Sequence, residues 1–181
     1  MSVEALTVRA VDARLIRVPM RRPLHTSAAR VTHAPLVLLD LHTDQGVTGR
    51  AYLFCYLEAL GRAVVGLARD TAPLLVGRSG QPGAVRRTLT SAFRLAGVGG
   101  PTAMLLSGLD MACWDALALA AELPLVRLLG AEPRPWLEYV DWANPILREP
   151  LDVSTGTATP SERAGVGLEW DEDAVARYRA A

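Results

Sequence analysis

The strongest constraint on the fold is the apolar stretch from Pro101 to Gly130. Between Ala103 and Ala121 the only charged residues are Asp110 and Asp115, and apolar side chains fall on every face of the helix that this stretch predicts. A helix that is apolar all round is buried in a core or spans a membrane. The two carboxylates argue against lipid, because a membrane span carries few or no charges. We therefore expect a long buried helix that the rest of the chain serves to cover.

Composition narrows the classes of protein that this chain can be. Its length of 181 residues fits one domain or two, and a hydrophobic share of 50% is enough to build a core. The 19 cationic and 19 acidic residues balance, so no net charge attracts nucleic acid or an anionic membrane. All the cations are arginines, which excludes every mechanism that needs a lysine. Without an apolar N-terminal leader we expect a cytoplasmic protein, with Cys55 and Cys113 as buried free thiols.

The N-terminal third predicts an antiparallel meander of three strands. Alternating apolar and polar residues indicate a strand over residues 6–18 that ends at Pro19, and a loop follows over residues 20–34. Apolar runs at residues 36–44 and 47–56 predict two further strands, joined by the turn signal Asp44-Gln45-Gly46. So short a turn requires these two strands to be antiparallel. Gly49 within the third strand marks a bulge or a close approach of another backbone.

Helical periodicity takes over after the third strand. It predicts one helix from Leu57 to Leu75 and a second that starts at Pro82 and runs to Leu95, before the long apolar helix. Weak alternation over residues 150–159 suggests a small hairpin, and Asp171 is placed to cap a last helix. Strands followed by a run of helices are typical of the α+β class. We therefore predict a three-stranded antiparallel meander followed by a helical bundle.

Four segments of the sequence resemble one known family. They are VRAVDARLIRVPMRRPLHTSAARVTHAPLVLLDLHTDQGVTGRAYLF, FRLAGVGG, GLDMACWDALA and PLVRLLGAEPRP, between about Leu6 and Pro135. Together they resemble the N-terminal capping domain of the mandelate racemase and muconate lactonizing enzyme family, in the enolase superfamily. The resemblance implies a capping domain over residues 1–135 and a C-terminal segment, residues 136–181, that docks back on it. The family continues into a TIM barrel of roughly 200 residues or more, for which these 181 residues have no room.

The resemblance also implies a chemistry, although most of its residues have no counterpart here. The family abstracts the proton next to a carboxylate and stabilises the product on Mg²⁺, with three carboxylate ligands, a lysine base and a histidine base on barrel strands. We therefore predict no catalytic residue, no metal ligand and no cofactor in this chain, with magnesium belonging to the intact family. Asp110 and Asp115 are five residues apart on one helix and point in different directions, so we interpret them as helix-end or arginine-pairing residues.

What the resemblance does map onto this chain is the half of the family's site that selects the substrate. Two loops of the cap close over the substrate in the family, and they match Pro23–Val31 and the stretch around Ala51–Tyr56. Closure of such loops excludes water and shapes the pocket. The candidate substrate-binding residues are Leu24, His25, Ala29, Val31, Tyr52 and Phe54. Arg30 and His33 in this region suit an anionic or hydroxylated substrate better than an aryl group.

Several of these residues have a simpler interpretation that stays open. His25, His33 and His42 fit a solvated set in a loop and at a strand end, and without cysteine or carboxylate partners at ligand spacing they do not predict a zinc site. Tyr52 and Phe54 are two residues apart on one strand face, where packing on the sheet explains them as well as substrate contact does.

Three hypotheses for function follow from these observations. The first is a barrel-less fragment of a mandelate racemase-like enzyme, inactive alone, whose cap loops recognise an α-hydroxy acid or sugar acid when a barrel is present. The second is a non-enzymatic oligomerisation or partner-binding module, because a helix that is apolar on every face needs cover. The third is one half of a split racemase or dehydratase. As partners we expect a second copy or a barrel-bearing chain, and neither nucleic acid nor a membrane.

Overall fold

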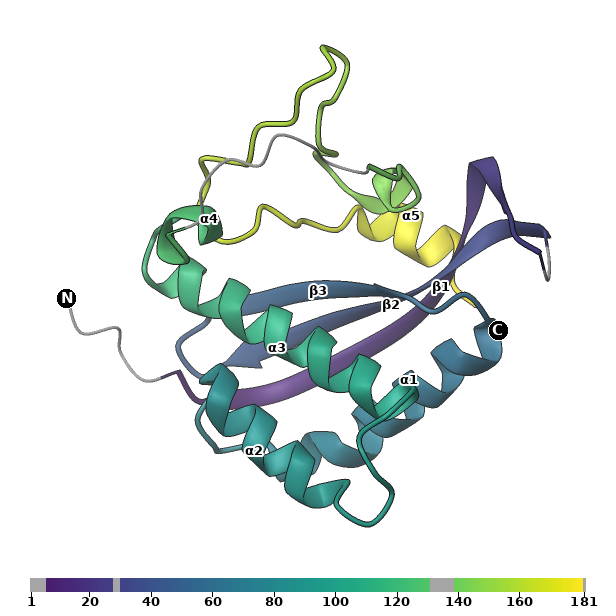
Figure 1. Ribbon diagram of the computed structural model, residues 1–181. Coiled ribbons are helices and arrows are strands. Elements are labelled where there is room, and N and C mark those ends of the chain that lie inside the picture. The colour runs from purple at the N-terminus through teal and green to yellow at the C-terminus, as the bar shows by residue number, and fades with distance from the viewer. Residues whose placement is uncertain (1–5, 28–29, 131–138, 181) are drawn as a thin grey trace.

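A three-stranded antiparallel sheet forms the middle layer of the protein (Figure 1). The computed structural model describes residues 6–27, 30–130 and 139–180. The strands are β1 (Val8–His25), β2 (Arg30–Thr43) and β3 (Thr48–Phe54), with β2 in the centre. Helices cover one face of the sheet, and the C-terminal segment covers the other (Figure 1). The predicted α+β class and the predicted three-stranded meander are confirmed.

The hairpin of β1 and β2 is longer than the sequence predicts. β1 does not end at Pro19, and residues 20–25 and 30–34 are strand. Pro19 pairs with His33, and the register shifts between Pro19 and Leu24 before the ladder resumes. Proline is tolerated because β1 is an edge strand, and because an irregular register does not need its missing N–H. The prediction of a loop over residues 20–34 is therefore wrong for both arms of this hairpin.

The turn and the glycine predicted in the meander both have clear structural reasons. Residues 44–47 connect β2 to β3, with Gly46 in the left-handed region at φ +80°. At Gly49 a Cβ would lie 2.0 Å from the carbonyl oxygen of Ala112 and 2.8 Å from Ala116. The pairing of β2 with β3 passes Gly49 without a shift in register. Of the two roles predicted for Gly49, the close backbone approach is confirmed and the bulge is wrong.

Three helices form the layer on one face of the sheet. They are α1 (Glu58–Thr71), α2 (Pro82–Ala92) and α3 (Pro101–Ala120); the short turn η1 (Ala72–Leu74) follows α1, and α4 (Leu125–Leu128) follows α3. Helix α1 lies along β1, α3 lies along β3, and α2 packs against α3. The buried residues of this layer, here called the helix-side core, are Leu6, Val8, Val37, Leu39, Leu41, Ala51, Leu53, Cys55, Val64, Ala68, Leu75, Val85, Leu89, Phe93, Leu105, Leu109, Ala112, Cys113, Ala116 and Leu117.

The long apolar helix α3 is packed against the sheet. Its length and composition would suit a membrane span, but 56% of that window is buried inside the protein. A core helix passes the same test of length and composition. Gly108 allows the close packing, because a Cβ there would lie 2.4 Å from Leu39 and 2.9 Å from Leu53. Met111 on the outer side is 44% exposed, so the rest of the chain does not cover every face of this helix.

Residues 139–180 lie across the other face of the sheet, and they contain the turn η2 (Asn144–Ile146) and helix α5 (Glu172–Arg177). The hairpin predicted over residues 150–159 is wrong, because the stretch has a turn but no strand. Its residues are mostly polar and exposed, so strand pairing there would bury little apolar surface. The cap predicted at Asp171 is confirmed, since its carboxylate accepts a hydrogen bond from the N–H of Ala174.

Candidate functional site

The sheet face under the C-terminal segment has an apolar half and a polar half. The apolar half adjoins the β1–β2 hairpin, and we call it the second core. Its buried residues are Ile16, Val18, Met20, Ala34, Leu36, Leu38, Ala143, Ile146, Trp170, Ala174 and Val175. Side chains alternate between the two faces along a strand. Leu36, Leu38 and Asp40 of β2 therefore all point away from the helices.

Three of the predicted substrate-binding residues lie against the second core. Leu24 of β1 and Val31 of β2 are paired across the hairpin, and both pack on this core. Phe54 at the end of β3 packs on it as well, with its ring centre 4.5 Å from that of Trp142. Residues from all three strands therefore contribute to the border of one core.

The other three predicted residues are placed differently. Tyr52 of β3 is 37% exposed, and burial raises the pKa of its phenol, with a further contribution from Tyr139. His25 is exposed at the end of β1, paired with Arg30 of β2. Ala29 lies outside the described residues. Tyr52 and His25 thus reach solvent, whereas Leu24, Val31 and Phe54 are half-buried.

The chain leaves β3 through an uncommon backbone conformation. Tyr56 has φ 57°, in the left-handed region that bulky residues rarely adopt. Its side chain is 59% exposed, and its ring centre lies 4.3 Å from that of Phe54. Strain of this kind clusters at ligand-binding sites. Sequence reasoning placed Tyr56 in a cap loop but did not single it out, because a backbone angle leaves no signal in the sequence of a tyrosine.

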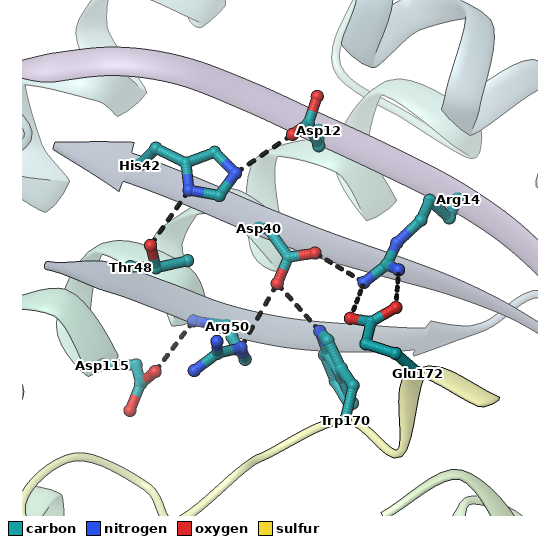
Figure 2. A network of polar contacts seen from close by, with 9 residues as sticks. All are labelled: Asp12, Arg14, Asp40, His42, Thr48, Arg50, Asp115, Trp170 and Glu172. Atoms are coloured by element: carbon teal, nitrogen blue, oxygen red, sulfur yellow. Dashed lines mark hydrogen bonds and ion pairs between the residues drawn. The ribbon is translucent and has the colours of Figure 1, made fainter. Parts of the chain in front are cut away.

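Figure 2 shows the polar half of this face, which is centred on Asp40. Asp40 is 6% exposed and accepts hydrogen bonds from Arg14 Nη2 and Trp170 Nε1, both at 2.8 Å. Arg50 Nε lies 3.4 Å from the same carboxylate but donates no hydrogen bond. A buried carboxylate is tolerated only when it is paired and hydrogen-bonded. Asp40 meets this condition because the C-terminal segment supplies Trp170.

Arg14 connects Asp40 to helix α5. Its guanidinium also donates to the two carboxylate oxygens of Glu172, at 2.5 Å and 3.2 Å. Burial lowers the pKa of Arg14, but the hydrogen bond to Glu172 and the charge of Asp40 outweigh burial, so the pKa is raised. Arg14 is therefore a permanently charged residue that links β1 to β2 and to helix α5.

Asp115 forms a second connection, between α3, β3 and the C-terminal segment. Its carboxylate is 2% exposed and accepts hydrogen bonds from the N–H of Arg50 at 2.8 Å and of Val166 at 2.6 Å. Burial raises the pKa of Asp115, although these two N–H groups oppose the shift. Gly165 passes so close that a Cβ there would lie 2.6 Å from the carboxylate. The helix-end interpretation of Asp115 is wrong, because the residue lies within α3 and binds backbone N–H groups of two other segments. Of the arginine pairing, what the structure shows is a favourable charge interaction with Arg50.

The three histidines do not form one solvated set. His42 is half-buried in β2, and its ring nitrogens lie 3.0 Å from Asp12 Oδ2 and 2.9 Å from Thr48 Oγ1 (Figure 2). His33 lies 3.0 Å from the hydroxyl of Thr32, and His25 is exposed. His42 is therefore a cross-strand connector, which corrects its assignment to the solvated set.

The described residues do not fit a magnesium ion. Nowhere in residues 6–27, 30–130 and 139–180 do three or more His, Cys, Asp or Glu side chains gather as a metal site. Mg²⁺ is bound through carboxylates with open oxygens, whereas the buried carboxylates Asp40 and Asp115 are occupied by the donors named above. Cys55 and Cys113 are buried free thiols, as predicted, and burial raises their pKa to about 11 and about 12.

Comparison with known proteins relates this fold to a known family. The family model described as the mandelate racemase / muconate lactonizing enzyme N-terminal domain matches residues 10–130. A solved chain of an enolase from alpha proteobacterium BAL199 with bound Mg has a TM-score of 0.90; the match covers 97% of this chain and 100% of that chain at 18% identity, which shows the fold alone.

Two further relatives are similar to the cap. An enolase from Bradyrhizobium, solved with magnesium and mandelic acid, is 40% identical with a TM-score of 0.62, over 75% of this chain and 37% of that one. The L-talarate/galactarate dehydratase of Salmonella typhimurium is 26% identical over 140 residues, which is 76% of this chain and 34% of the dehydratase. The chain thus spans about a third of the length of this curated relative. Because the family model matches well over half of its residues, the chain belongs to the mandelate racemase / muconate lactonizing enzyme family, with residues 10–130 matching the N-terminal domain.

Proposed function

We propose that this chain is the substrate-capping part of an enzyme that acts on 2-hydroxy acids or sugar acids, and that it is inactive alone. One observation carries the proposal. Leu24, Val31 and Phe54 all pack on the second core, and Tyr52 and His25 on the same strands are exposed, while the described residues hold no metal group. Such a set can enclose a substrate but cannot polarise its carboxylate. The relatives that act on or bind such acids support this class of substrate.

Each part of this group has a separate task in the proposal. The half-buried Leu24, Val31 and Phe54 form an apolar wall that excludes water from the reacting part of the substrate. The Tyr52 hydroxyl and the His25 ring are exposed, and in the proposal each is available to donate a hydrogen bond to a substrate oxygen. The proton-abstracting groups and the metal ligands come from residues that this chain does not contain.

The preferred substrate in this proposal carries an anionic or hydroxylated distal end. Arg30 is exposed and paired with His25 in the hairpin, so its guanidinium is free to reach a carboxylate or hydroxyl group. A galactarate-type sugar acid and mandelate differ in this distal end. A complex with a barrel-bearing chain that turns over mandelate at least as well as the sugar acid would contradict this preference.

The first experiment measures exchange of the substrate's α-proton. The purified chain is incubated in D₂O with Mg²⁺ and either mandelate or galactarate, and deuterium at the α position is followed by NMR. We expect no exchange above a protein-free control, because the chain has no lysine and its described residues offer no metal site. Exchange that co-purifies with the chain would overturn the proposal of an inert cap.

A chimera tests the capping role itself. This chain's cap replaces the matched domain of the Bradyrhizobium enzyme, to which it is 40% identical. Phe54→Ala and Leu24→Ala should each lower kcat/KM about tenfold, since pockets discriminate through such apolar contacts. The control is Val98→Ala, in the loop between α2 and α3 and 50% exposed. Equal kcat/KM in the chimera and all three variants would show that these residues do not contact substrate.

A second candidate function is a binding module for another copy or a barrel-bearing chain. Three large side chains at the end of β3 favour it, namely Tyr52, Tyr56 and Leu57, which are 37%, 59% and 66% exposed. Adjacent exposed apolar groups mark interaction sites. We expect self-association in light scattering, and a monomer at all concentrations would contradict that.

The fold resembles soluble enzyme domains, and we propose a cytoplasmic location, which cell fractionation would test.

A further inference from the structure

Four arginines converge in a cleft on the helix side of the hairpin. The cleft has a volume of about 540 Å³ and is lined by Arg17, His33, Glu58, Arg62, Arg177 and Arg179, with the last residues of the described chain. Leu15 of β1 packs on the helix-side core and Val18 on the second core, so Arg17 points toward the helices. The cleft therefore lies at the edge of β1, between α1 and the segment after α5.

Backbone pairing at the end of the chain creates this convergence. The N–H of Arg17 donates to the carbonyl of Tyr178 at 2.7 Å, and the N–H of Ala180 donates to the carbonyl of Leu15 at 3.1 Å. These bonds place the segment after α5 against the edge of β1 (Figure 1). Arg177 and Arg179 are thereby held next to Arg17, from which they are separated by about 160 residues of sequence.

The charges in the cleft are unbalanced. Glu58 is the one carboxylate among the lining residues, and it is shared by Arg17 Nε at 2.9 Å and Arg62 Nη1 at 3.5 Å. Within the part of the chain that the structure describes, neither Arg177 nor Arg179 has a carboxylate within 4.0 Å. Among the described lining residues, four guanidinium groups thus face a single carboxylate. Their mutual repulsion is relieved when an anion enters between them.

We propose that this cleft binds a small oxyanion with two negative charges, carried on carboxylate or phosphate groups. Guanidinium groups present paired N–H donors that match the oxygens of both groups. The cleft volume falls within the range of small-molecule sites, roughly 300–1,000 Å³. Glu58 holds Arg17 and Arg62 in place, which leaves Arg177 and Arg179 as the principal anion contacts. This site is separate from the proposed substrate-capping end and does not depend on it.

The test is a binding titration of the full chain at low ionic strength. Inorganic phosphate and succinate are titrated separately, with calorimetry for affinity and amide NMR for location. We expect saturable binding of at least one of them, with the largest shifts at Arg17 and Arg179, and weakening as NaCl is added. The two arms separate phosphate from dicarboxylate chemistry. No saturation up to about 10 mM of either anion would overturn the proposal, since this range detects millimolar Kd values.

Charge-matched variants separate a built site from a general effect of charge. Arg177→Gln with Arg179→Gln should weaken binding about tenfold or more, and Arg62→Gln, on the exposed face of α1, should weaken it less. The control is Arg69→Gln, at the far end of α1 and paired with Asp70. It should keep the wild-type Kd within about twofold. If Arg69→Gln weakens binding as much as Arg62→Gln does, the anion is held by diffuse charge and the proposal fails. Arg62→Gln keeps the test valid if the double variant does not fold.

Discussion

The two faces of the sheet are closed in different ways. On the helix side, α1 and α3 meet the strands through aliphatic side chains, with Gly49 and Gly108 at points where no Cβ fits. On the other side, the second core is smaller, and the C-terminal segment is fastened by three polar anchors. These anchors are Trp170 to Asp40, Glu172 to Arg14, and Val166 to Asp115.

This difference shows that the two faces of one sheet can be stabilised by different interactions, apolar packing on one and polar contacts on the other. Packing on the helix side depends on the shapes of the side chains, so a small change in the volume of one side chain disturbs its neighbours. The C-terminal side depends on a few bonds between residues 51 to 158 positions apart in sequence. Loss of one such bond leaves a buried polar group without its partner. We therefore expect the free energy needed to open the C-terminal segment locally to be lower than that needed to open the helix layer.

The largest effect is expected for Gly49→Ala on the helix side. The new Cβ would lie 2.0 Å from the carbonyl oxygen of Ala112, and a backbone atom in a packed helix cannot move aside cheaply. We expect a loss of about 3 kcal/mol in the free energy of unfolding, measured in urea. The matched control is Gly66→Ala within α1, where nothing lies within 4 Å of the added atom. It should gain about 0.5–1 kcal/mol. Similar values for the two variants would contradict tight packing at Gly49.

Trp170→Phe should have the next largest effect, on the C-terminal side. It removes the N–H that donates to Asp40 at 2.8 Å and keeps most of the apolar surface. We expect a loss of about 2 kcal/mol, with faster amide exchange in residues 139–180 and unchanged exchange in α3. The control is Trp114→Phe, whose indole packs beside the helix-side core. Equal acceleration of exchange in α3 and in the C-terminal segment would refute separate opening of the two faces.

A pH dependence should follow from Asp115. Burial raises its pKa above the ordinary 3.8, so the folded protein binds this proton more tightly than the unfolded chain does. The resulting stabilisation is complete below pH 3.8 and is lost as the pH rises through the folded-state pKa. Relative to Asp115→Asn, the wild type should therefore lose stability as the pH is raised through the acid range. Urea unfolding of both proteins measures this, and an advantage of the wild type that grows with pH would contradict it.

The smallest effect is expected at the two thiols of the helix-side core. With pKa values of about 11 for Cys55 and about 12 for Cys113, about one thiol in a thousand or fewer is ionised at pH 8. Neither should react with a thiol reagent in the folded wild type or in Trp170→Phe, and both should react in urea. Rapid labelling of folded Trp170→Phe would mean that losing one polar anchor also opens the helix side.

Much of the fold could be predicted because it depends on local patterns in the sequence. The period of the apolar residues located α1, α2 and α3, and Asp171 was recognised as a cap. The extension of the β1–β2 hairpin was missed because Pro19 ends a strand in most contexts, and only its position on a sheet edge makes it harmless.

The candidate site could be predicted only in part. Leu24, Val31 and Phe54 were named from a family resemblance, and the structure places them against one core. Tyr56 was not singled out, because its left-handed backbone is invisible in the sequence. The role of Asp40 was missed as well, although a lone charge within an apolar strand was a usable signal that a partner is required.

The sequence by itself determined the main strands and helices, their order, the family and the absence of any lysine, because these depend on residues near one another in the chain or on composition alone. Only the tertiary structure decided which polar groups meet. Asp40 finds Trp170 across 130 positions, and Arg17 is joined by Arg177 and Arg179 through pairing at a strand edge. Such contacts depend on how the sheet, the helices and the C-terminal segment fold over one another, and no local periodicity encodes them.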